Sequence, residues 1–170
     1  KKMYPYFCTL HSLAYKCLRL EPHEIMDELD YMELSDMTGR KFVNKMKKGN
    51  GIDISMPTAQ SQYQDTINLA YAKYPNDKDR LQKIFREVKL ADYGARNTIM
   101  QMDKDLTNFK RDRHKLEYVD YFNSFLETKN PPMLKYLFID EAQDLSAHQW
   151  MVVDMIQRVS KPVETYIAGD

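Results

Sequence analysis

A chain of 170 residues is long enough for one sizeable hydrophobic core or two small ones, and its few glycines and prolines, five and seven, favour helices over a turn-rich all-β fold. The 25 basic and 25 acidic residues give a formal net charge of zero, so any nucleic-acid site must be a local patch. No apolar run is long enough to cross a membrane. The spacing of Cys8 and Cys17 does not indicate a metal site or a disulfide framework, which favours a cytoplasmic protein with reduced thiols.

The first 21 residues predict a short strand and then a helix. The strand is expected over Tyr4 to Thr9, and the helix begins at His11 or Ser12 and continues to about Leu20. Thr9, His11 and Ser12 lie at the junction, where hydroxyls and free backbone N–H groups can bind phosphate oxygens. A capping role for Thr9 or Ser12 explains the same residues equally well.

Residues 22–130 predict several amphipathic helices and almost no strand. The expected helices lie at 24–29, around 34–37 with a stop at Gly39, from 57 to 74, from a cap at Asp77 to 88, and from about 98 to 128 with a break near 110–114. Tyrosine and methionine recur on their stripes, which is more typical of a buried helix face than of a base-stacking platform.

The densest basic stretch of the chain lies within this helical region. It contains Arg40, Lys41, Lys45, Lys47 and Lys48, and a Gly-Asn-Gly turn follows it. A solvated loop accounts for such a stretch. The alternative is contact with the backbone of duplex DNA, for which this stretch is the best local candidate.

The last forty residues predict a strand, a helix and a second strand. Lys135 to Asp140 favours a strand buried on both faces, a helix follows from Ser146 to a stop at Lys161-Pro162, and Val163 to Ala168 favours the second strand. Strands joined by a helix in this way are parallel. With the strand at Tyr4 to Thr9 in the same sheet, residues 1–21 and 131–170 form one α/β domain, and residues 22–130 are an insertion.

Two neighbouring carboxylates, Asp140 and Glu141, follow the first of these strands directly. Ligands of open α/β sheets bind at the carboxyl ends of the strands. A carboxylate there can hold Mg²⁺ through its water shell, and a neighbouring glutamate can polarise the water that attacks a γ-phosphate. The alternative is a strand that ends in a solvated acidic turn.

The sequence around these acids resembles motif II of the UvrD/Rep family of superfamily 1 DNA helicases, in which the string is Asp140-Glu141-Ala142-Gln143-Asp144. Two other stretches resemble the same family in the expected order. Thr9-Leu10-His11-Ser12 is similar to motif Ib, with Leu10 where the family usually has phenylalanine, and Ala168-Gly169-Asp170 is similar to the start of motif III.

This resemblance implies a partial RecA-like parallel sheet, formed by the two chain ends, with a mostly α-helical inserted subdomain. It implies that Asp140 and Glu141 hold the Mg²⁺ of MgATP, that Glu141 activates water, and that Gln143 senses the γ-phosphate. Asp144, Gly169 and Asp170 would complete the ATP site, while Thr9, His11 and Ser12 would contact single-stranded DNA. Single-stranded DNA and a duplex junction are the implied partners, with ATP, for a monomer or weak dimer.

The 170 residues contain no Gly-x-x-x-x-Gly-Lys-Ser/Thr phosphate loop, which the family carries upstream of motif Ib. The chain also begins without methionine and stops just after a strand, so we expect a piece of a longer protein that has no ATPase activity alone. A non-catalytic DNA- or protein-binding helical module on a degenerate RecA-like base is the alternative function. The motor part of a helicase–nuclease is a third.

Overall fold

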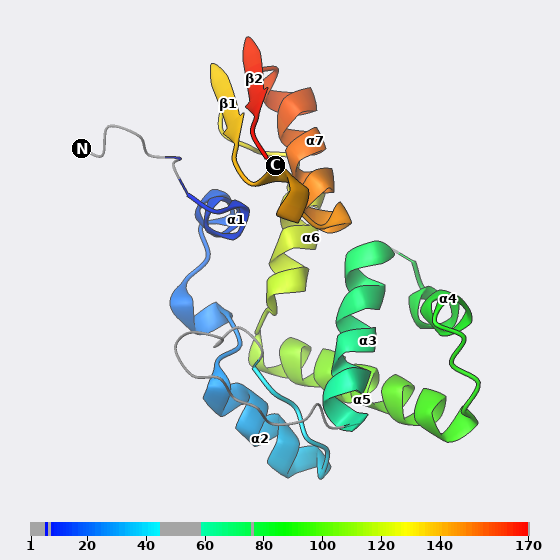
Figure 1. Ribbon diagram of the computed structural model, residues 1–170. Helices are drawn as coiled ribbons and strands as arrows, with labels where there is room; N and C mark the ends of the chain where they lie inside the picture. Colours follow the sequence, from blue (N-terminus) through cyan, green and yellow to red (C-terminus); the bar gives the residue numbers. More distant parts are fainter. Residues whose placement is uncertain (1–5, 7, 45–58, 76, 170) are drawn as a thin grey trace. The chain divides into compact units, whose positions relative to one another are not determined.

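The computed structural model describes residues 6, 8–44, 59–75 and 77–169, and the chain forms two compact units (Figure 1). One unit contains Lys1–Glu21 and Tyr118–Asp170, and the other contains Pro22–Glu117. The division begins at Pro22. It ends at Glu117 rather than at residue 130, because helix α6 (Tyr118–Thr128) packs with the chain ends.

Three helices build the unit of the chain ends. Helix α1 (Leu10–Leu18) packs against α6, and α6 packs against α7 (Ala147–Ser160). The buried face of α6 carries Tyr121, Phe122 and Phe125, which are all almost fully shielded from solvent. An aromatic face of this kind contributes about 1.5–3 kcal/mol for each ring that it buries, so α6 is central to this core.

Two parallel strands complete this unit, as the sequence predicts. Strand β1 (Tyr136–Ile139) pairs with β2 (Glu164–Ile167), and Tyr136 lies opposite Glu164 in the register. Helix α7 joins the strands and covers one face of the sheet, where Val153 packs with Ile139 (Figure 1). The α/β character of the chain is confirmed.

The expectation that the first strand is buried on both faces is wrong. Phe138 is 72% exposed and Tyr166 is 48% exposed, and their rings stack on the uncovered face of the sheet with centroids 4.8 Å apart. Among the described residues the sheet has two strands, and the exposure of these two rings shows that this face is open to solvent. Three of the six residues of the strand expected over Tyr4 to Thr9 lie outside the described residues, and Tyr6, Cys8 and Thr9 are not in a strand.

The second unit is helical, as predicted. It contains a short 3₁₀ helix at Pro22–Glu24 and then α2 (Glu28–Thr38), α3 (Ala59–Lys73), α4 (Arg80–Glu87) and α5 (Tyr93–Arg113). Helix α3 packs against α4 and α5, and α2 packs against α5. The fully buried side chains at the centre of this core include Leu34, Ile67, Ile84, Phe85, Ile99, Met102 and Leu106.

Some helix ends in this unit differ from the sequence prediction. The helix expected at 24–29 is wrong, because α2 begins later, after Asp27, whose side chain forms a reciprocal capping box with Asp30. The stop at Gly39 is confirmed, and this glycine has a φ of +66°. Helix α5 starts at Tyr93, five residues before the expected start at residue 98. The break expected near 110–114 is confirmed at His114, whose backbone is in the left-handed conformation.

The chain segments that enter and leave the helical unit are paired with each other. The N–H of Leu116 donates to the carbonyl of Glu24 at 2.7 Å, and the N–H of Met26 donates to the carbonyl of Leu116 at 3.0 Å. Beside this bridge the buried carboxylate of Glu117 accepts hydrogen bonds from the Tyr31 hydroxyl at 2.7 Å and from the Lys110 ammonium at 3.2 Å.

Candidate functional site

The acidic turn leaves the carboxyl end of β1 and reverses the chain at once. Asp140 and Glu141 are exposed, and Asp140 Oδ1 accepts the N–H of Glu141 at 3.1 Å. Glu141 has a left-handed backbone, with a φ of 51°, which costs about 1–2 kcal/mol in a residue that carries a side chain. The turn keeps this shape because its next residue, Ala142, is buried and tied to the neighbouring strand.

That tie continues the hydrogen-bond ladder of the sheet beyond the strands themselves. The N–H of Ala168, just after β2, donates to the carbonyl of Ile139 at 2.8 Å. The carbonyl of Ala168 then accepts the N–H of Ala142 at 2.9 Å. The residues of the acidic turn and those that follow β2 are therefore held at one end of the sheet, although helix α7 separates them in the sequence.

Gln143 connects these two segments through its side chain. Its amide Nε2 donates to Glu141 Oε2 at 2.6 Å, while its amide oxygen lies so close to Gly169 that a Cβ atom there would collide with it. Asp144 is exposed and donates its N–H to the carbonyl of Glu141 at 3.0 Å. The structure thus brings together four of the residues expected at the ATP site with Gly169, whereas Asp170 lies outside the described residues.

The carboxylates of the turn suit a Mg²⁺ ion that arrives with a phosphate ligand. Mg²⁺ keeps several waters and is bound through one or two carboxylates together with substrate phosphates. Asp140 and Glu141 supply two adjacent exposed carboxylates, and the described part of the chain contains no group of three or more His, Cys, Asp or Glu residues that could hold a metal by themselves. The donor set therefore fits Mg²⁺ carried by a nucleotide.

Thr9 and Ser12 form the start of helix α1. Thr9 Oγ1 accepts the N–H of Ser12 at 3.2 Å, and the two hydroxyl oxygens lie within 3.2 Å of each other. The capping role that the sequence left open is therefore present in the structure. Both residues are exposed, so their hydroxyls remain accessible from solvent.

His11 packs into the aromatic cluster of helix α6 instead of standing free. Its ring lies 4.2 Å from that of Phe122, and the rings of Tyr118 and Tyr121 approach it edge-on. Burial lowers the pKa of the His11 imidazole, which favours its neutral form. The sequence could not reveal this contact, because α6 lies more than a hundred residues further along the chain.

His148 belongs to the same cluster from the side of helix α7. Its ring lies 5.4 Å from that of Phe122, and its Nε2 is 2.9 Å from Oδ1 of Asn123. Burial, and to a smaller extent the charge of His11, lower the pKa of His148. Nothing in the sequence marked His148, which has an ordinary position on a helix that was otherwise predicted correctly.

The basic stretch is described only at its start. Arg40 pairs with Asp105 at 2.8 Å and is partly buried, while Lys41 is exposed. Lys45, Lys47 and Lys48 lie outside the described residues. Arg40 is thus engaged in an ion pair within the helical unit.

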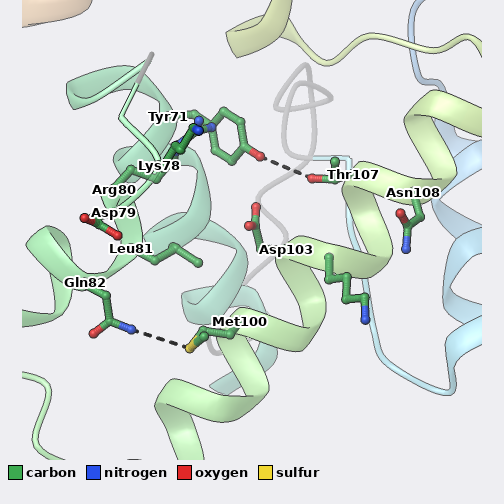
Figure 2. Close-up of a pocket in the computed structure, with 11 residues that line it drawn as sticks. Tyr71, Lys78, Asp79, Arg80, Leu81, Gln82, Met100, Asp103, Thr107 and Asn108 are labelled. Atoms are coloured by element: carbon green, nitrogen blue, oxygen red, sulfur yellow. Dashed lines mark hydrogen bonds between the residues drawn. The ribbon is translucent and has the colours of Figure 1, made fainter.

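The helical unit also contains a pocket of about 460 Å³ that sequence reasoning missed (Figure 2). Helices α4 and α5 line it together with Tyr71, whose hydroxyl lies 3.2 Å from that of Thr107. The guanidinium of Arg80 covers the ring of Tyr71 at 4.1 Å, and the carboxylate of Asp103 lies between the helices. Its lining mixes both charges, and no residue of the predicted sites contributes to it.

A protein-family profile, the UvrD/REP helicase N-terminal domain, matches residues 3–170 of this chain. Searches of curated proteins and of solved structures returned no match. Among the described residues no helix has the length and apolar character that crossing a membrane requires. The profile covers both the acidic turn and the helical unit, and the chain therefore belongs to the UvrD/REP helicase family.

Proposed function

We propose that this chain works within an ATP-dependent DNA helicase, which couples ATP hydrolysis to movement along single-stranded DNA and to duplex unwinding. The observation that carries the proposal is the exposed pair Asp140 and Glu141 at the carboxyl end of a parallel strand, in a member of a helicase family. Ligands of open α/β sheets bind at this edge. Exposed acids there are accessible to MgATP from solvent.

Each acid of the turn has a distinct proposed role. Mg²⁺, when bound with ATP, would neutralise phosphate charge. Asp140 would hold that ion through its water shell. Glu141 would orient the attacking water and accept its proton, so that the products are ADP and inorganic phosphate. Gln143 supports this role because its amide contacts the Glu141 carboxylate at 2.6 Å, and Asp144 would keep the turn in shape.

The proposed DNA contacts come from both units. Thr9 and Ser12, exposed at the start of α1, would bind phosphate oxygens, and His11 would hold that end of the helix through its aromatic contacts. The stretch from Arg40 to Lys48 would contact the duplex. Because Arg40 already pairs with Asp105, its share in duplex binding is expected to be small.

The test is the substitution Glu141→Gln in the full-length protein that carries this chain. We expect DNA-stimulated ATP hydrolysis to fall by about a hundredfold or more, since a positioned general base contributes roughly 10²–10⁴-fold to the rate. The affinity for a fluorescent ATP analogue should stay within about threefold, because glutamine keeps the shape of the glutamate side chain and loses only its charge and its ability to accept a proton. Glu127→Gln, which alters an exposed acid of α6, is the matched control.

Turnover retained by Glu141→Gln would exclude the role given to Glu141. An unmodified protein without any ATPase activity, but with intact DNA binding, would favour the non-catalytic binding module instead. The two outcomes are separated by measuring ATP hydrolysis and DNA binding on the same preparations.

A further inference from the structure

We infer that Gly169 is a positioning residue for ATP hydrolysis: its missing side chain leaves the space in which the Gln143 amide lies against the Glu141 carboxylate. This inference rests on the proposed function and deepens it. It replaces direct cofactor contact, the role that the family resemblance implies for Gly169, with an indirect one through Gln143.

The first evidence is the space around Gly169. A Cβ atom built there would fall closer to Gln143 Oε1 than real Cβ atoms approach any neighbour, and it would lie 3.4 Å from Gln143 Cδ. The other close atom is the backbone nitrogen of Ala142, at 3.3 Å, a tight contact that a shift of a few tenths of an ångström would relieve, whereas the contact with Gln143 Oε1 requires a larger displacement. A side chain at position 169 would therefore act mainly on the amide of Gln143.

The second evidence is that the backbone around this space is fixed. The hydrogen bonds from Ala142 to Ala168 and from Ala168 to Ile139 hold the segment after β2 against the acidic turn. Gly169 directly follows Ala168, and Gln143 directly follows Ala142. The backbone cannot open without breaking this ladder, so an added methyl group must displace the flexible end of Gln143.

The third evidence is what the amide does in its present position. Gln143 and Glu141 are both exposed, and an exposed glutamine side chain samples several rotamers unless contacts select one. Here the amide lies over Gly169 at one side and donates to Glu141 Oε2 at the other, at 2.6 Å. Gly169 thus leaves room for the rotamer that places a hydrogen-bond donor on the proposed general base, and the hydrogen bond to Glu141 favours that rotamer.

The experiment is a double-mutant cycle in the full-length protein. Gly169→Ala, Gln143→Ala and the double variant are compared with the unmodified protein in DNA-stimulated ATP hydrolysis and in thermal melting. We expect Gly169→Ala to lower kcat by about tenfold or more and to leave KM for ATP within about twofold, because misplacing a catalytic group affects the chemical step. Gly94→Ala, in helix α5 of the other unit, is the matched glycine control and should leave kcat unchanged.

The double variant distinguishes positioning from general strain. Once Gln143 is shortened, the added methyl group no longer meets its amide, so the double variant should match Gln143→Ala in kcat and should melt no lower than Gly169→Ala. Independent effects would instead multiply. The inference is overturned if the fold-loss in kcat of the double variant is the product of the two single losses. It is also overturned if Gly169→Ala leaves kcat unchanged. If the unmodified protein hydrolyses no ATP, the proposed function fails, and the inference fails with it.

Discussion

The buried carboxylate of Glu117 provides the sharpest test of what holds the helical unit together. The side chains of Glu117 and Lys110 are only 6% and 10% exposed, and their charged atoms lie 3.2 Å apart. Removing one member of a buried ion pair costs about 3–5 kcal/mol. The Lys110 ammonium also lies 5.2 Å from the centre of the Tyr71 ring, a contact worth about 1 kcal/mol, so we expect Glu117→Leu to cost about 3 kcal/mol.

The matched control replaces the pair as a whole. Lys110→Met combined with Glu117→Leu removes both charges and keeps apolar volume, and such replacements of buried pairs are often neutral or stabilising. We therefore expect the double variant to recover most of the stability, to within about 1 kcal/mol of the unmodified chain. The remaining loss is the hydrogen bond from the Tyr31 hydroxyl, which a further Tyr31→Phe substitution should offset.

Urea unfolding followed by far-UV circular dichroism measures these differences. The fluorescence of Trp150, the single tryptophan of the chain, reports on the other unit and serves as an internal control. A loss below about 1 kcal/mol for Glu117→Leu would show that the pair is effectively solvated. A double variant as unstable as Glu117→Leu alone would show that packing, not charge, explains the loss.

Two further predictions concern stability. The folded protein holds the pKa of His11 and of His148 below the ordinary value, so as the pH falls the unfolded chain binds protons at these histidines before the folded chain does. The stability that the two neutral histidines contribute is therefore complete above about pH 6.5, and it is lost as the pH falls through their folded pKa values. Melting temperatures between pH 8 and pH 5 should therefore fall less in a His11→Gln/His148→Gln variant than in the unmodified chain, and equal slopes would contradict this. Gly39→Ala should cost about 1 kcal/mol in urea unfolding, because no atom lies near the new Cβ and only the left-handed backbone opposes it; Gly39→Asn should cost less, and equal losses would contradict this reasoning.

The elements predicted well are those whose ends carry local signals. Ser146 caps α7 through a box with Gln149, Lys161 ends the same helix in a left-handed conformation, and Gly39 ends α2. Such signals act within a few residues and can be recognised in the sequence. The pairing of Ile25 with Leu116 could not be predicted, because two isolated residues far apart in the chain carry no pattern of their own.

In the candidate site, the positions of the acids could be predicted from the sequence, but the side-chain contacts could not. The order of a strand, two acids and a helix predicts where Asp140 and Glu141 lie, because the carboxyl ends of parallel strands share one edge of a sheet. The contact of the Gln143 amide with Gly169 depends on where the two strands end relative to each other, and atomic packing decides this. The contact of His11 with Phe122 likewise depends on how α1 and α6 meet, and helical periodicity gives only the face of each helix.

The bridge between Ile25 and Leu116 also bears on how such a protein can change over evolutionary time. The two segments pair side by side and run in the same direction, so the chain leaves the helical unit beside the point at which it entered. The unit formed by residues 22–117, ninety-six residues long, therefore has its two ends close together. A module attached in this way can be excised, lengthened or exchanged through a few residues of linker, which makes it the part of the molecule most open to acquiring new partners.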